Sequence, residues 1–301
     1  MIKVSILMNG YNCEKYVADA IDSVFFQKYK NWEIVFVDNC SIDNTASIVH
    51  SYKSERIKYI STSEHISLGA ARAVGLESCD GDYICFLDTD DLWLKEKLSS
   101  QLDLFSKNKN LKMVYTGVTF IDADSKEIGR YIPKAKKGDV FRRQLVRYEI
   151  NQQSVMIKND FSFSFDRTKK YSVDYCLFMS ICSKYEVEFL KDIYVKYRMH
   201  DSNLSHSANE LEWIEQKDAL DKVFEETPSL KDIYVDEYKQ AYARVYYYKA
   251  RYLMKIDKRR QACQELKGYA NINLFYFGLY VLSFFPSSFW NYIHRKIRKF
   301  S

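Results

Sequence analysis

Three acidic side chains stand together directly after an apolar run in the segment YICFLDTDDLW, positions 83–93. Carboxylates a few ångströms apart raise one another's pKa and oppose folding unless a positive group lies among them, and a divalent metal with oxygen ligands satisfies that need. Asp88 and Asp90 are therefore candidate metal ligands, although two solvated loop residues would show the same pattern. We expect Asp91 to cap a helix that begins at DLWLKEKL.

Polar residues also follow two earlier strand-like runs. Tyr11 lies in the sequence NGYN, and Asp38 opens the sequence DNCSIDNT. Because the carboxyl ends of parallel strands share one edge of a sheet, where open α/β folds bind ligands, both side chains should approach Asp88 and Asp90. A carboxylate there suits a ribose or base, and a tyrosine ring offers a stacking face unless it is only a surface aromatic. The sequence lacks a G-x-G-x-x-G fingerprint and a G-x-x-x-x-G-K-[ST] loop, so a diphosphate would be neutralised by metal.

A scaffold of alternating strands and helices must position these residues, and the first 120 residues show that alternation. Apolar, strand-like runs lie at 4–8, 32–37, 57–61 and 82–87, and the next strand candidate is 112–122. Helix-like runs lie between them at 14–27, 44–54 and 68–79. Short apolar strands separated by helices predict an α/β fold with a mostly parallel sheet covered on both faces. KAKKGD (134–139) is an expected exposed loop, and after residue 206 the pattern is almost wholly helical.

Composition narrows the classes of function. The chain has 301 residues, enough for one large α/β domain and a smaller one. Its net charge of +5 comes from 45 basic and 40 acidic side chains mixed along the chain, which argues against nucleic acid as a partner. Seven cysteines without CxxC spacing are typical of reduced thiols in a cytosolic protein. The opening MIKVSILM predicts a buried strand and not a signal peptide.

Five segments, in this order, resemble glycosyltransferase family 2, whose nucleotide-sugar-binding α/β fold is called GT-A. VSILMNGYN (4–12) resembles the family's opening V-S-V-I-I-P-x-Y-N, and VDNCSIDNT (37–45) resembles V-D-D-G-S-x-D-x-T. The segment 68–93 resembles A-R-N-x-G…G-x-Y-I-x-F-L-D-S-D-D-x-W. YSVDYCLFMSI (171–181) resembles Y-E-D-Y-D-L-W-L-R, and YVKYRMHDSNLS (194–205) resembles Y-R-x-H-x-x-S-x-S.

The resemblance covers residues 1–205 and implies a GT-A glycosyltransferase domain there. For 206–301, the helical pattern and the composition predict a helical, membrane-associating region. The resemblance implies a metal-dependent, inverting transfer of a sugar from a nucleoside-diphosphate sugar, with UDP as the commonest nucleotide, to a saccharide hydroxyl. The implied acceptor is lipid-linked, as in the assembly of lipopolysaccharide, capsule or glycoprotein glycans. The expected location is cytoplasmic, peripheral to the inner face of a bacterial membrane.

Position by position, the resemblance implies a role for each matched side chain of the donor site. Asp38 and Arg72 would hold the base, with Tyr11 stacked beside it. Asp88 would approach the ribose or the metal. Asp90 would coordinate Mn²⁺ or Mg²⁺ bridging the diphosphate, where the metal stabilises the charge that grows on the leaving oxygen.

The resemblance also implies a catalytic base. Asp174 matches the residue that takes the proton of the acceptor hydroxyl as this oxygen attacks the anomeric carbon from the face opposite the diphosphate. The same side chain could instead, or in addition, cap the helix before YCLFMSI. His200 matches a histidine near the diphosphate and metal, with a structural role as the alternative, and Arg198 is a candidate phosphate contact.

Four residues depart from the family pattern. Asn9 stands in place of its proline, Asn39 of its second aspartate, Cys40 of its glycine and Val173 of the glutamate before the base. The changes at 39 and 173 keep a non-catalytic sugar-nucleotide-binding protein as an alternative. FLDTDDLW also resembles the D-x-D-x-[TV] signature of haloacid-dehalogenase-type phosphatases, but Leu92 stands where threonine or valine belongs.

The C-terminal segment 272–290 contains no charged residue, and NYIHRKIRKF follows it with four basic side chains. As one helix, the nineteen residues would span about 29 Å, near the hydrocarbon thickness, yet Pro286 and several serines interrupt them. The open interpretations are a transmembrane span, a buried core or homodimer helix, and an in-plane interfacial anchor. Aromatic and basic composition favours the anchor. Its expected headgroup contacts are Arg295, Lys296, Arg298 and Lys299.

Overall fold

The computed structural model describes residues 1–200 and 210–298, with side chains as far as residue 293. The chain divides into two compact units. The first comprises Met1–Gln144 and Tyr148–Asn203, and the second comprises Leu145–Arg147 and Leu204–Ser301.

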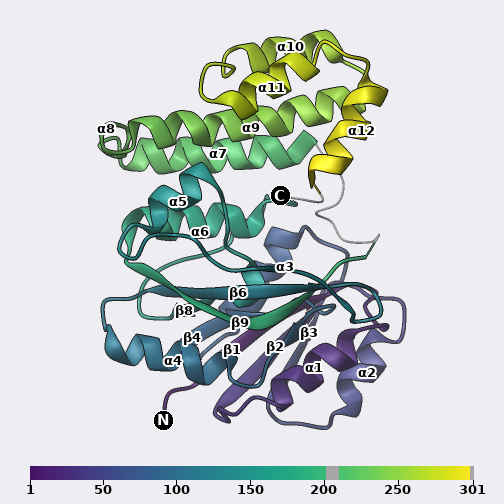
Figure 1. Cartoon of the computed structure of the whole chain (residues 1–301). Coiled ribbons are helices and arrows are strands. Elements are labelled where there is room, and N and C mark those ends of the chain that lie inside the picture. Colours follow the sequence, from purple (N-terminus) through teal and green to yellow (C-terminus); the bar gives the residue numbers. More distant parts are fainter. Residues whose placement is uncertain (201–209, 299–301) are drawn as a thin grey trace. The chain divides into compact units, whose positions relative to one another are not determined.

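Within the described residues of the first unit, nine strands form one curled sheet (Figure 1). They are β1 (Val4–Gly10), β2 (Trp32–Asp38), β3 (Ile57–Ser61), β4 (Tyr83–Phe86), β5 (Leu92–Trp93), β6 (Met113–Ile121), β7 (Glu127–Tyr131), β8 (Met156–Lys158) and β9 (Val187–Arg198). Their order is β3-β2-β1-β4-β8-β6-β9-β5, with β7 beside β6. β1 is parallel to β2 and β4, β2 to β3, and β6 to β9, whereas β5, β7 and β8 run antiparallel to their neighbours. The predicted α/β fold with a mostly parallel sheet is confirmed.

Helices cover both faces of this sheet. They are α1 (Val17–Phe25), α2 (Thr45–Ser51), α3 (Leu68–Glu77), α4 (Lys97–Lys107), α5 (Val140–Val146) and α6 (Val173–Lys184), with a 3₁₀ turn at Gln152–Ser154. Val17 of α1 and Leu98 of α4 join Ile6 of β1 in one buried cluster. On the opposite face the ring of Phe86 lies 5.5 Å from Phe165 and 6.0 Å from Phe178 of α6. Figure 1 shows α1, α2 and α4 on one side of the sheet and α3 and α6 on the other.

Helix α3 lies directly on β1 and β2 because it carries a glycine at the contact. A β-carbon on Gly75 would stand 2.1 Å from Leu7 and 2.8 Å from Val37, so either these side chains or the helix would have to move. The close approach fixes α3 over the strand ends, and the helix starts at Ser67, whose hydroxyl accepts a hydrogen bond from the amide of Ala70. Arg72 is thereby held near the edge where β1, β2 and β4 end.

The prediction that a helix begins at DLWLKEKL is wrong for its first residues. Leu92 and Trp93 form β5, which pairs antiparallel with Lys196 and Val195 of β9, and α4 begins only at Lys97. The reason is tertiary: the indole of Trp93 is buried and donates to the backbone oxygen of Gln153 at 2.9 Å. The spacing of apolar residues in this segment is typical of a helix. Burial of the Trp93 ring and pairing with β9, about a hundred residues later in the chain, nevertheless favour a strand here.

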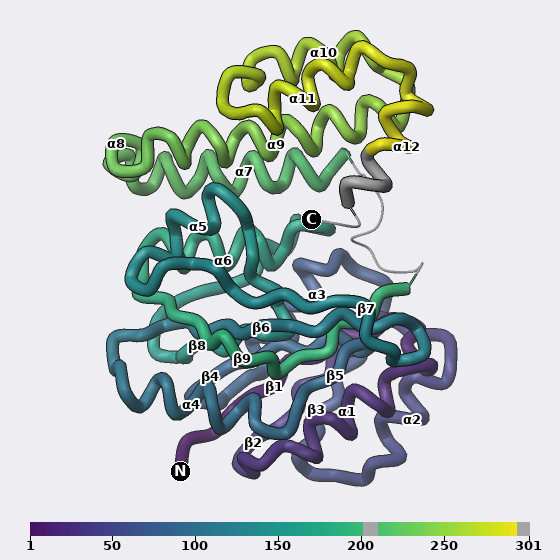
Figure 2. Tube along the Cα trace, in the orientation of Figure 1, coloured from purple at the N-terminus to yellow at the C-terminus, as the bar shows by residue number. Residues whose placement is uncertain are grey.

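From residue 210 to 298 the second unit consists of helices joined by short turns, which confirms the helical pattern predicted after residue 206 (Figure 2). Its helices are α7 (Glu210–Glu226), α8 (Leu230–Ile233), α9 (Val235–Lys255), α10 (Arg259–Lys267), α11 (Leu274–Leu282) and α12 (Ser287–Arg298). Met254 of α9, Leu266 of α10, Leu279 of α11 and Trp290 of α12 share one buried cluster. This small core ties the last four helices together.

The apolar segment 272–290 forms parts of two helices instead of one, because α11 ends at Leu282 and α12 begins after Pro286. Of the helices that the structure describes, none has both the length and the apolar run that crossing a bilayer requires. Leu279 and Trp290 are buried, whereas Phe277 and Phe284 are exposed. The expected headgroup contacts fall outside the description: Lys299 entirely, and Arg295, Lys296 and Arg298 in their side chains.

Candidate active site

The carboxyl ends of β1, β2 and β4 meet at one edge, as the sequence predicts. Gly10 pairs with Asp38 in the sheet, and the amide of Leu87 donates to the backbone oxygen of Leu7. Tyr11, Asp38 and Asp88 therefore follow neighbouring strands at the same edge.

Asp88 is held by two buried partners. Its Oδ2 accepts a short hydrogen bond from the Gln153 amide, while its own backbone amide donates to Gln153 Oε1 at 3.0 Å. The Arg72 guanidinium lies 3.4 Å from Asp88 Oδ1. Arg72 is almost fully buried, and its Nε has no hydrogen-bond partner among the described residues. A buried cation that keeps an unsatisfied donor has capacity for an anionic or carbonyl group of a ligand.

Asp90 pairs with the histidine that follows β9. Its Oδ2 lies 2.9 Å from His200 Nε2, and the His200 ring stacks on Tyr16 with 5.6 Å between ring centres. Burial raises the pKa of Asp90, the charge of Asp88 raises it further, and the His200 contact lowers it. A buried carboxylate with a second negative charge close by, beside an imidazole, favours a positive charge at this place.

Asp91 does not cap a helix, which corrects the expectation for this residue. It is 1% exposed, and its Oδ1 accepts a hydrogen bond from the backbone amide of Arg198 at 2.7 Å. Burial raises the pKa of Asp91 well above its ordinary range, and Asp90 and Asp88 raise it further. The side chain fastens the acidic segment to the end of β9.

Arg198 is a buried connector. Its Nε donates to the backbone oxygen of Asp90 at 2.9 Å, and its Nη1 donates to Ser125 Oγ and the Ala123 backbone oxygen. The guanidinium also lies 4.4 Å over the ring of Tyr16. With 1% of the residue exposed, these contacts suit a residue that positions Asp90. The phosphate contact expected from the sequence stays a prediction.

The nucleotide side of the site has one exposed ring and one buried carboxylate. Tyr11 is 48% exposed and meets His65 edge-on, with 4.3 Å between ring centres. Asp38 is buried, accepting hydrogen bonds from the amide of Ser41 and the hydroxyl of Tyr59. Each carboxylate oxygen of Asp38 is thus oriented before a ligand arrives, and its remaining lone pairs stay available.

Two departures from the family pattern have local explanations. Asn39 donates from Nδ2 to the Ile66 backbone oxygen and accepts at Oδ1 from the Ile66 amide, a reciprocal pair that an aspartate cannot form. Cys40 has a φ of 66°, in the left-handed region where glycine is unstrained. The backbone that favours glycine in the family is therefore kept here with a side chain, at a cost of about 1 kcal/mol.

Asp174 lies in the first turn of α6, where the N-cap is Ser172 and not Asp174. Burial raises the pKa of Asp174, and the nearby charge of Arg72 lowers it. The hydroxyl of Tyr148 lies 3.5 Å from Asp174 Oδ2, a long contact. Val173 is 1% exposed and belongs to the core, so this position offers a ligand nothing in place of the family's glutamate.

The donor set around Asp90 suits a hard or borderline divalent cation. Carboxylate oxygens of Asp88 and Asp90 and the imidazole of His200 are ligands that Mn²⁺ accepts. Among the residues that the structure describes, no group of three or more His, Cys, Asp or Glu side chains is placed to hold a metal ion by itself. Phosphate oxygens and water would have to complete the coordination, as is usual for Mg²⁺ at substrate phosphates.

Three contributors to the site were not predicted from the sequence. Gln153 positions Asp88, Tyr148 approaches Asp174, and Tyr16 supports both Arg198 and His200. Gln153 had one usable signal, because the polar run NQQS precedes the apolar VMI of a strand. The two tyrosines had none, since the chain contains 25 tyrosines.

Comparisons with known proteins relate this chain to one enzyme family. A sequence model of the family described as Glycosyl transferase family 2 matches residues 5–167. An Escherichia coli relative, named UDP-Glc:alpha-D-GlcNAc-diphosphoundecaprenol beta-1,3-glucosyltransferase WfgD, is 29% identical over 250 residues, which are 81% of this chain and 90% of that protein. The Rickettsia typhi glycosyltransferase RT0329, itself uncharacterized, is 32% identical over 72% of this chain and 70% of its own length.

Among solved structures, S. aureus TarS 1-349 in complex with UDP-GlcNAc aligns with a TM-score of 0.62 and 15% identity. The alignment covers 94% of this chain and 90% of that one. At this identity the likeness establishes the fold alone.

Proposed function

The chain belongs to glycosyl transferase family 2, and we propose that it transfers a sugar from a nucleoside-diphosphate sugar to a saccharide hydroxyl with inversion at the anomeric carbon. In this proposal Asp174 is the catalytic base. Tyr11, Asp38, Arg72 and Asp88 bind the nucleotide, and Asp90 with His200 faces the diphosphate.

One observation carries the proposal: a buried arginine links the donor side of the site to the candidate base. Arg72 contacts Asp88 at 3.4 Å, and its charge lowers the pKa of Asp174. A base must be ionised to accept a proton, and burial alone would keep Asp174 protonated to higher pH. In this proposal Arg72 has two roles. It binds the donor together with Asp88, and its positive charge favours the ionised form of Asp174, which can accept a proton.

The chemistry is a single displacement. The acceptor oxygen forms a bond to the anomeric carbon while the bond from that carbon to the diphosphate oxygen breaks, and its electron pair leaves with the nucleoside diphosphate. The proton of the acceptor hydroxyl passes to an Oδ atom of Asp174. Asp90 and His200, with Asp88 nearby, would hold a divalent cation, Mn²⁺ or Mg²⁺, which would supply positive charge for the leaving group.

Two similar proteins support a proposal for the donor and acceptor classes. The name of WfgD specifies a UDP-sugar donor and a diphosphoundecaprenol-linked acceptor, and TarS has been solved with UDP-GlcNAc. We extend these to a UDP-sugar and a lipid-linked saccharide here, in cell-surface glycan assembly such as lipopolysaccharide synthesis. Such an acceptor would bring the enzyme to the inner face of the cell membrane as a peripheral protein.

The phosphatase alternative is wrong, because the segment FLDTDDLW belongs to the family 2 match at 5–167. A non-catalytic binding protein would differ from the enzyme in one measurable respect, which is turnover. That difference defines the test.

The test uses Asp174→Asn, which keeps the size of the side chain but removes its capacity to accept the proton. We expect kcat for transfer from a UDP-sugar to fall by about 10²–10⁴ while donor affinity changes little. Asp160→Asn is a matched control, since Asp160 pairs with Lys112 and Lys158 at the surface. Equal activity of the two variants would reject Asp174 as base, and a product with retained anomeric configuration would reject the single displacement.

A further inference from the structure

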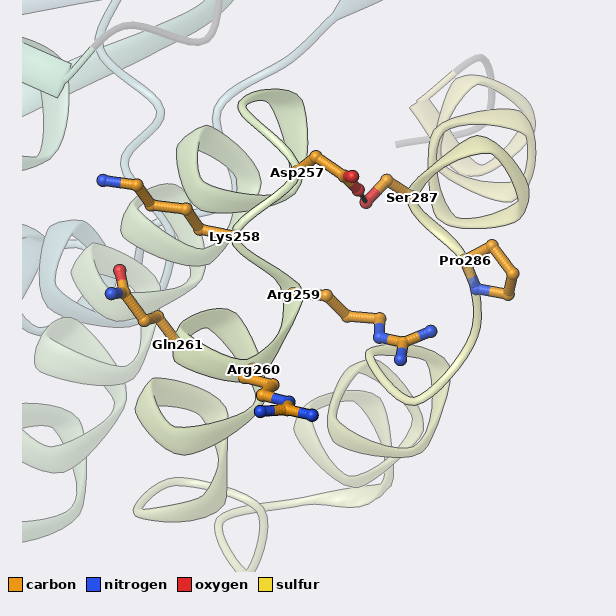
Figure 3. A pocket seen from close by; sticks show the side chains of 7 residues that line it. All are labelled: Asp257, Lys258, Arg259, Arg260, Gln261, Pro286 and Ser287. Carbon is orange, nitrogen blue, oxygen red and sulfur yellow. Dashed lines mark hydrogen bonds between the residues drawn. The ribbon is translucent and has the colours of Figure 1, made fainter.

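A cleft of about 550 Å³ in the second unit lies where α9 passes into α10 and where α12 begins. Its basic lining is Lys258, Arg259 and Arg260, and Pro286 and Ser287 form the facing wall. Figure 3 shows the Arg259 side chain extending toward Pro286, while Asp257 and Ser287 meet at one end. The cleft is built from two chain segments that come together around one small core.

The lining of this cleft carries a net positive charge, since three of its side chains are cationic and one, Asp257, is acidic. Lys258, Arg259 and Arg260 are all exposed, and none forms an ion pair with another described residue. The acid in the lining, Asp257, accepts a hydrogen bond from Ser287 at 2.6 Å, so its oxygen is engaged at the end of the cleft. Helix α10 also starts here without a side-chain cap, which leaves its first amides open to an anion. The cleft therefore suits a phosphate group.

An uncovered apolar surface adjoins the cleft. One side of α11 carries Leu274, Phe277 and Val281, and Phe284 continues it toward Pro286. These side chains are 88%, 50%, 41% and 57% exposed. Their spacing of three and four residues puts them on one helix face, opposite the buried Leu279. An exposed apolar face of this kind marks an interaction site.

We propose that this surface docks on an anionic phospholipid bilayer, with headgroup phosphates in the cationic cleft and the exposed face of α11 at the acyl boundary. Charge complementarity selects this occupant, because apolar rings beside clustered Lys and Arg match an amphiphile with a phosphate head. A partner protein with an apolar face would leave the three cations unpaired. The inference rests on the proposed function only in that a lipid-linked acceptor brings the enzyme to a membrane.

The test is sedimentation of the whole protein with vesicles of phosphatidylcholine, with and without phosphatidylglycerol. We expect binding only to the anionic vesicles, and about 100-fold weaker binding for Lys258→Glu/Arg259→Glu/Arg260→Glu, at about 1 kcal/mol per cation. The matched control carries the same change of charge on exposed helix surfaces of the same unit. It is Lys222→Glu/Lys231→Glu/Lys239→Glu. Equal loss in both triple variants, or no binding by the wild type, would overturn the proposal.

A second pair of variants tests the apolar face without changing charge. Phe277→Ser/Phe284→Ser should release the protein from anionic vesicles, whereas Ile233→Ser/Val235→Ser, also exposed and in the same unit, should not. If the wild type instead forms a dimer in solution that the first pair dissolves, the face is a contact between two copies and the proposal is wrong. Donor turnover in the absence of lipid is measured in parallel, so failure of vesicle binding is separable from failure of the transferase assignment.

Discussion

Replacing Gln153 by leucine isolates the contacts that hold Asp88 in the site. The substitution removes a hydrogen bond to the Asp88 carboxylate and another that the Asp88 backbone amide donates, while leaving the size of the side chain nearly unchanged. Gln152 provides the control, because it is the next residue, is 7% exposed, and makes no side-chain hydrogen bond within the described structure. Gln153 is 2% exposed, so the two substitutions differ mainly in hydrogen bonding.

The magnitude follows from the two bonds. A bond to a charged group contributes about 1.5–3 kcal/mol and one from a backbone amide about 1 kcal/mol. The Asp88 side chain is 36% exposed, so water recovers part of the first bond when the amide is lost. We therefore expect Gln153→Leu to lower the free energy of unfolding by about 2 kcal/mol, and Gln152→Leu by less than about 0.5 kcal/mol.

Urea denaturation measures this difference, and about 2 kcal/mol corresponds to a midpoint lower by roughly 1 M for a slope of about 2 kcal/mol/M. Titration with a UDP-sugar gives a second readout. Asp88 without its amide partner is free to swing, and we expect donor affinity about tenfold weaker in Gln153→Leu only. If both variants unfold at the same urea concentration and bind donor equally, Gln153 does not position Asp88 and the reasoning fails.

Three further results are expected. Asp90→Ala should abolish turnover and metal-dependent nucleotide binding while the protein stays folded, since it also relieves repulsion from Asp88; full activity in EDTA would contradict this. Burial raises the pKa of Asp174, so kcat/KM should increase with pH as this carboxyl ionises, at a pH above about 4, the ordinary aspartate value. The Asp174→Asn variant should not show this increase. Burial lowers the pKa of Lys97 from 10.5 to about 8, so the folded protein binds fewer protons than the unfolded chain between these values and gains stability as pH rises through them. The full gain in the free energy of unfolding is about 3 kcal/mol, and the Lys97→Met variant should not show it. If the free energy of unfolding changed equally with pH in wild type and variant from pH 8 to about pH 10, titration of Lys97 would not contribute to stability.

The sequence predicted the part of the fold that local periodicity controls. The runs 32–37 and 57–61 became β2 and β3 within one residue, because each is a short apolar strand between helices. The helix expected at DLWLKEKL failed because the burial of Trp93 and its pairing with β9 depend on distant residues. No window of sequence contains that information.

The same division applies to the site. Convergence of Asp38 and Asp88 was predictable, since parallel strand ends share an edge. The partner of Asp88 was not, because Gln153 comes from a turn 65 residues later that local pattern does not connect to the acid. Clusters of charged residues can be recognised in a sequence, whereas the neutral side chains that orient them, such as Gln153, cannot.

The hydrogen bond between Asp91 and Arg198 joins the acidic segment to β9, and it affects the order in which parts of the chain can fold. Asp91 and Arg198 stand 107 residues apart in the chain, and closing a loop of that length costs on the order of 4 kcal/mol of chain entropy. Parallel strands at the other end of the sheet, β1 to β4, close shorter loops and can pair first. We therefore expect that the nucleotide half of the site can assemble during synthesis before Arg198 and His200 are present, and that the diphosphate half is completed only when β9 has been added.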